Sequence, residues 1–167
     1  MTPNAPRHAN SIQSSYGDNL ELIVQEGVRL ILFLREWNAA GKPWKFGGVV
    51  VERATGAPGF IQGKFGVGDH KNFEVVFPVE DRVEICWRDN CPAGDMTWKL
   101  GGVVTYGTGI VNAVAMTRGS LFDQIDLITQ ECWESVFQYY RYQETNGERV
   151  WLRNACLRIH EGKLGER

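Results

Sequence analysis

The sequence predicts an all-β fold built from a tandem repeat, and three observations predict it. Runs of about 5–8 residues are rich in β-branched and aromatic side chains, which favour strands. Turn-forming residues such as Gly41, Gly94 and Gly147 separate these runs, and no segment is typical of a helix. One tryptophan and one arginine also recur at spacings of 53 or 54 residues: Trp44, Trp98 and Trp151, and Arg35, Arg88 and Arg141.

The repeat divides most of the chain into three copies, at about residues 19–66, 72–122 and 124–162. The copies begin with NLELIV, NFEVVF and the more divergent QIDLIT. Each copy is expected to form three or four short strands. Tight connections at residues 25–27 and 79–81 predict antiparallel meanders.

A repeat of slightly more than 50 residues with four antiparallel strands is typical of a β-propeller blade. We predict one three-blade unit at residues 9–162, between tails at residues 1–8 and 163–167. The segment ANSIQSSYG at residues 9–17 resembles GFIQGKFG, the last strand of the first copy, and the third copy lacks such a strand. Three blades are too few for a ring. We therefore expect two chains to form a six-bladed homodimeric ring, each donating residues 9–17 to the other's third blade.

Composition excludes several classes of function. The formal net charge of −2 offers no basic surface for nucleic acid or an anionic membrane. The apolar stretches are too short to span a membrane, and the amino terminus lacks the apolar core of a signal peptide. A cytoplasmic or unconventionally released protein is expected.

The sequence contains no motif for a metal or cofactor. Cys86, Cys91, Cys132 and Cys156 lack the spacing of zinc ligands and are expected to be reduced, with Cys132–Cys156 the favoured bridge under oxidising conditions. Phosphate-loop and serine-hydrolase motifs are missing as well. We therefore expect no cofactor.

The recurring arginines and tryptophans have two interpretations each. An arginine beside an acid could hydrogen-bond sugar hydroxyls, or it could anchor the buried acid of its copy, and the second interpretation is favoured. These acids are Glu21, Glu74 and Asp126. The recurring tryptophans could contact sugar, but core packing between blades is favoured. Trp87 does not recur and is the best candidate for stacking on a ligand.

The segments NFEVVF, CWRDN, a tryptophan about ten residues later and the strand FIQGKFG resemble the Photorhabdus-type lectin-like β-propellers. The resemblance covers about residues 9–157. It implies pockets between blades for fucose or related sugars. Because Tyr140, Tyr142 and Gln143 replace Trp87, Asp89 and Asn90 in the third copy, the sites are expected to be unequal. The candidate ligand-binding residues are Trp87, Arg88, Asp89, Asn90, Arg35, Glu36, Trp44, Trp98, Arg141 and Trp151.

Two other functions remain open. A cofactor-free cyclase, isomerase or pericyclase of natural-product biosynthesis would leave little trace in the sequence, because shape and a few polar groups can suffice. Its candidate residues are Glu21, Glu74, His70, Tyr106 and Tyr142. The third possibility is a structural or interaction module.

Overall fold

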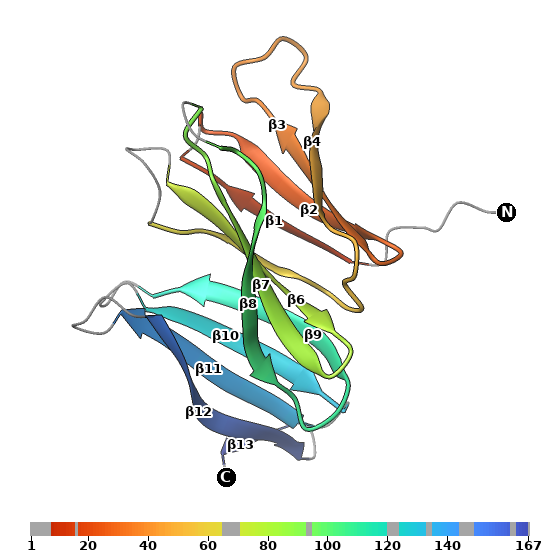
Figure 1. Cartoon of the computed structure of the whole chain (residues 1–167), viewed down its shortest axis with the longest axis vertical. Coiled ribbons are helices and arrows are strands. Elements are labelled where there is room, and N and C mark those ends of the chain that lie inside the picture. The colour runs from red at the N-terminus through yellow and green to blue at the C-terminus, as the bar shows by residue number, and fades with distance from the viewer. Residues whose placement is uncertain are drawn as a thin grey trace, which may run out of the picture.

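The computed structural model describes residues 8–15, 17–64, 71–92, 95–119, 124–132, 135–143, 149–160 and 163–166. These residues form three antiparallel β-sheets and no helix, as Figure 1 shows with the sheets stacked along the long axis. The predicted all-β fold is confirmed. Within the described ranges, no helix is long and apolar enough to cross a membrane.

Each sheet takes its strands from consecutive parts of the chain. The first sheet has the order β1 (Ala9–Gln13), β2 (Leu20–Glu26), β3 (Arg29–Arg35), β4 (Trp44–Val51). The middle sheet has the order β5 (Gly59–Gln62), β6 (Asn72–Val79), β7 (Arg82–Asp89), β8 (Lys99–Tyr106). The third sheet contains β9 (Val111–Arg118), β10 (Ile125–Glu131), β11 (Ser135–Gln143), β12 (Arg149–His160) and β13 (Lys163–Glu166).

The sheets are out of phase with the sequence repeat by one strand. The strand GFIQ ends the first copy but pairs with β6 of the second, and β9 likewise pairs with β10. A reason lies in the connection after β4, where the Thr55 N–H donates to the Pro78 carbonyl (2.9 Å) and the Thr55 hydroxyl accepts from the Glu80 N–H (2.8 Å). These bonds hold the end of the first copy against the middle sheet.

Both chain ends form strands within the sheets. At the N-terminal end, β1 pairs with β2 of the same chain, from Ala9 opposite Val24 to Gln13 opposite Leu20. The exchange of residues 9–17 between two chains stays a prediction. At the other end, Lys163–Glu166 forms β13 against β12 where a tail was predicted. The acids Glu21, Glu74 and Asp126 accordingly lie on the second strand of each sheet.

The middle sheet is buried on both faces. Successive side chains of a strand point to opposite sides, so Phe73, Val75 and Phe77 of β6 pack against the first sheet, whereas Val76 packs against the third. Every residue of β6 is buried, but β2 and β10 alternate between buried and more exposed positions. The two hydrophobic cores of the molecule are therefore the two sides of one sheet.

Glycine pairs shape the outer strands of the first two sheets. The pairing between β3 and β4 shifts register beside Gly47, and that between β7 and β8 shifts beside Gly101. A Cβ atom on either glycine would lie 2.9 Å from a side-chain carbon of Leu32 or Ile85. These register shifts are β-bulges at which the missing side chain of glycine allows the strands to approach closely.

Replacing Phe77 by alanine tests the role of the middle sheet. Phe77 is fully buried in the core shared with the first sheet, so its truncation should lower the free energy of unfolding by about 3–5 kcal/mol. Urea denaturation followed by tryptophan fluorescence measures the change. Val28→Ala, at an exposed turn position, is the control and should have little effect.

Candidate ligand-binding seams between the sheets

Each interface between neighbouring sheets places a carboxylate of one sheet near an arginine and a tryptophan of the next. We call these interfaces the first seam, between the first and middle sheets, and the second seam, between the middle and third sheets. The first seam contains Glu21, Arg88 and Trp98; the second contains Glu74, Arg141 and Trp151. The two groups come from equivalent positions of the repeat.

The second seam holds a buried ion pair. The Nη2 atom of Arg141 lies 2.6 Å from Oε2 of Glu74, and both side chains are at least nine-tenths buried. Asn72 donates to Oε1 of Glu74 (3.1 Å), while the Arg141 guanidinium lies 5.2 Å from the ring centroid of Trp151. At this seam an arginine anchors a buried acid, as the favoured interpretation of the sequence predicts, but the acid belongs to the preceding copy and not to the arginine's own copy.

The first seam has a different electrostatic balance. The Arg88 guanidinium lies 5.2 Å from the Phe73 ring and 5.3 Å from the Trp98 ring, and its Nη2 donates to Oδ1 of Asn90 (3.3 Å). Burial raises the pKa of Glu21 to about 6, although the Ser14 hydroxyl and the charge of Arg88 act in the opposite direction. The cost of burying the carboxylate therefore exceeds the stabilisation that its neighbours supply.

The first seam contains polar atoms that are buried without a hydrogen-bond partner among the described residues. They include Oε2 of Glu21, an acceptor, and Nε1 of Trp98, a donor. Both residues lie near Arg88: its charge acts on Glu21, and its guanidinium lies over the Trp98 ring. Unpaired buried polar atoms are uncommon in folded proteins and are a reason to look for a ligand or water at such a place.

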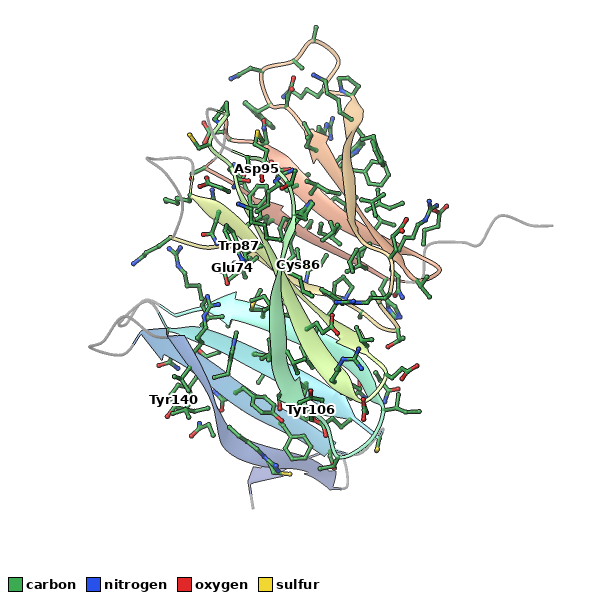
Figure 2. All side chains as sticks on the ribbon, in the orientation of Figure 1. Glu74, Cys86, Trp87, Asp95, Tyr106 and Tyr140 are labelled. Carbon is green, nitrogen blue, oxygen red and sulfur yellow. The ribbon has the colours of Figure 1, made fainter. Side chains whose placement is uncertain are left out.

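The run Trp87–Arg88–Asp89–Asn90 does not form one site. Neighbouring residues of β7 point to opposite faces, so Arg88 faces the first seam whereas Trp87 lies on the side of the second. Trp87 sits opposite Glu74 in the pairing of β6 with β7, and Figure 2 shows the two residues side by side. It is 36% exposed and has Lys99 Nζ 5.0 Å from its ring centroid. Asp89 accepts from the Cys91 N–H (2.9 Å).

The candidate residues of the first copy lie outside both seams: Arg35 and Trp44 on the outer face of the first sheet, and Glu36 directly after β3. Arg35 stands opposite Trp44 in the pairing of β3 with β4, and its Nε donates to the Lys42 carbonyl (2.7 Å). Glu36 forms an ion pair with Lys45 at 2.7 Å. Trp44 is 44% exposed. Arg35 and Trp44 correspond to the arginine and the tryptophan of a seam, without the acid that a preceding sheet would supply.

The structure does not gather the candidate catalytic residues. Glu21 and Glu74 lie in different seams, and Tyr106 is exposed at the opposite end of the β7–β8 pair from Trp87. His70 and the side chain of Tyr142 lie outside the described residues.

The four cysteines are free in this structure, and burial raises the pKa of the Cys86 thiol to about 11. In the part of the chain that the structure describes, no three histidine, cysteine or acidic side chains gather as metal ligands would.

The sequence interpretation missed two residues that hold the acids. Asn72 bonds Glu74, and Ser14 bonds Glu21. The pattern N-x-E at Asn19 and Asn72 was a signal for the first kind of contact. Compared with known proteins, the sequence matches no family model and no curated protein.

Glu74→Gln tests the buried ion pair. The substitution keeps the shape of the side chain but leaves the Arg141 charge buried without its counterion, so the free energy of unfolding should fall by about 3–5 kcal/mol. Chemical denaturation measures the change. Glu36→Gln breaks an exposed pair with Lys45 and should cost less than about 1 kcal/mol.

The raised pKa of Glu21 predicts a pH dependence of stability. Because the folded chain binds this proton more tightly than the unfolded chain, the extra stability is present below about pH 4.5 and is lost as the pH rises to about 6. Relative to wild type, Glu21→Gln should therefore gain up to about 2 kcal/mol over this range. Ser14→Ala should shift the transition to higher pH, because it removes a hydrogen bond that lowers the pKa. Thermal unfolding between pH 4 and pH 8 measures both effects, and parallel profiles for wild type and Glu21→Gln would contradict the assignment.

Proposed function

We propose that this chain is a non-enzymatic carbohydrate-binding protein that takes fucose-like or related sugars at the seams between its sheets. The observation that carries the proposal is that Glu21 Oε2 and Trp98 Nε1, both in the first seam, are buried without a hydrogen-bond partner among the described residues. Sugar hydroxyls are donors as well as acceptors, so a sugar can donate to the carboxylate and accept from the indole. A ligand rich in hydroxyls suits this combination better than an apolar or anionic one.

Aromatic surface beside a charged group supports the same ligand class. At the second seam, the partly exposed ring of Trp87 offers an apolar face for the C–H groups of a sugar ring. Lys99, which lies over this ring, would supply donors for hydroxyls at its edge. The Glu74–Arg141 pair is already satisfied, so contact at this seam would rest mainly on Trp87.

The proposal includes an arrangement of the sheets as blades of a propeller. Supporting it, β5 contacts both β1 and β9, so the first strands of the three sheets are neighbours, as strands around a central axis would be. Two copies of this chain would supply six blades. Weak sites distributed around such a ring would bind a glycosylated surface with an avidity greater than the affinity of one site.

The raised pKa of Glu21 favours a second candidate function. A carboxyl group that titrates near pH 6 can act as a general acid or base, so the first seam could promote a cofactor-free cyclisation or isomerisation. This candidate would be favoured if Glu21→Gln lowered the turnover of a substrate and left the Kd of that substrate unchanged. If the protein binds neither sugars nor small molecules, the remaining candidate is a structural or interaction module.

Trp87→Ala tests the carbohydrate proposal. Loss of the exposed ring should weaken fucoside binding about tenfold or more, because stacking is the main contact expected at the second seam. A glycan array identifies the sugar, and calorimetry measures its Kd. Trp37→Ala is the matched control, since Trp37 is also exposed but lies in the β3–β4 connection. Equal binding by wild type and Trp87→Ala would refute the role of Trp87.

A further inference from the structure

The two outermost sheet faces of the chain carry the two halves of a third seam. We call the outer side of the first sheet the arginine face; its residues include Leu20, Leu22, Val24, Phe33, Arg35 and Trp44. We call the outer side of the third sheet the acid face; its residues include Asp126, Ile128, Gln138, Tyr140 and Leu152. The stacking in Figure 1 places these faces at opposite ends of the molecule.

The repeat shows how the arginine face is used elsewhere in the chain. Leu20 corresponds to Phe73 of the middle sheet and to Ile125 of the third, and both of these are buried against the preceding sheet. Leu20 itself is 37% exposed, whereas Phe73 and Ile125 are 0% and 2% exposed. The arginine face therefore has a residue type that is buried between sheets elsewhere in the molecule, but within the described residues no sheet covers this face.

The acid face shows the reciprocal difference. Ile128 corresponds to Ile23 and Val76, which are fully buried because the next sheet covers them. Ile128 is only half-buried, and Leu152 on the same face is exposed. The acid face therefore carries Ile128 at a position that the next sheet covers in both the first and the middle sheet.

Charges at the two faces complete the correspondence. Arg35 occupies the repeat position of Arg141, which pairs with Glu74 on the preceding sheet. Asp126 occupies the position of Glu74. Within the described residues, neither Arg35 nor Asp126 has an ion pair; Asp126 accepts from the side-chain amides of Gln124 and Gln138 (2.9 and 3.3 Å).

We propose that a second copy of this chain completes the third seam, with the arginine face of one protomer packed on the acid face of the other and Arg35 bound to Asp126 of the partner subunit. A twofold arrangement forms this seam twice, joins six sheets and covers every outer face. Unlike the exchange expected from the sequence, it leaves β1 within its own sheet. The assembly stands independently of the ligand, but the use of the third seam as a sugar site, with Trp44 beside Arg35, rests on the proposed function.

Charge reversal tests the contact directly. Wild type should sediment as a particle of twice 18.9 kDa at micromolar concentration. Arg35→Glu and Asp126→Arg should each weaken association by at least about 100-fold, because each puts like charges together at both seams. The double variant should recover the dimer. An equimolar mixture of the two single variants should also form a dimer, since one of its seams is native and the other has reversed charges.

Controls separate the contact from general effects of charge or folding. Asp81→Arg reverses an exposed charge at the β6–β7 turn, away from both faces, and should remain dimeric. Circular dichroism establishes that each single variant is folded, and Leu20→Lys provides a second disruption of the arginine face at a position already partly exposed. A monomeric wild type overturns the proposal, as does a dimer that both charge reversals leave intact or folded single variants that fail to associate when mixed.

Sugar binding distinguishes this inference from the proposed function. A monomeric Arg35→Glu variant should keep the first and second seams and lose one sugar site per chain in calorimetry. A wild-type dimer that binds no sugar would refute the proposed function and leave the assembly standing. A dimer whose Arg35→Glu variant keeps the full number of sugar sites would refute the ligand role of the third seam alone.

Discussion

The structure depends on the need to neutralise a carboxylate that each seam buries. An unpaired charge is costly inside a protein, so a sheet that carries a buried acid requires a cation from the sheet packed against it. Arg141 meets this need for Glu74 by direct contact, and Arg88 acts on Glu21 through its charge. Because arginine recurs every 53 residues, the middle and third sheets each carry one arginine at the interface with the preceding sheet.

The two complete seams differ at the residue that directly follows the first strand of the first and of the middle sheet. Ser14 lies where the repeat places Gly63, and its hydroxyl donates to Glu21. A Cβ atom at Gly63 would be 2.6 Å from Oε1 of Glu74 and 2.4 Å from Oδ1 of Asn72, so the middle sheet has no room for a serine there. Glycine allows Asn72 to approach Glu74, whereas at the first seam a hydroxyl supplies the contact. Similar repeats therefore produce a closed ion pair at one seam and a titratable carboxyl at the other.

The sequence was sufficient for the fold class, because strand propensity and the repeat are local properties. It also favoured the anchoring of the buried acids by arginines, since recurrence of both residue types indicates a structural pair. It assigned each acid to the arginine of its own copy, however, whereas Arg141 binds Glu74 of the preceding copy. The partner of the segment at residues 9–17 was not predictable from resemblance alone: the pattern of a strand says which face is apolar but not which neighbouring strand it pairs with. The run from Trp87 to Asn90 looked like one pocket because its residues are contiguous, although a period of two places them on opposite faces.

The composition of the outer faces constrains how copies of this chain can meet. Two arginine faces packed together would bury apolar surface, but they would also bring two Arg35 side chains into an interface without a carboxylate from the acid face. Two acid faces would bury Asp126 beside the glutamines with no cation opposite. Only the packing of an arginine face on an acid face supplies both the apolar contact and the ion pair already present at the second seam. The same electrostatic requirement that orders the sheets within the chain therefore selects the orientation in which a second chain can continue them.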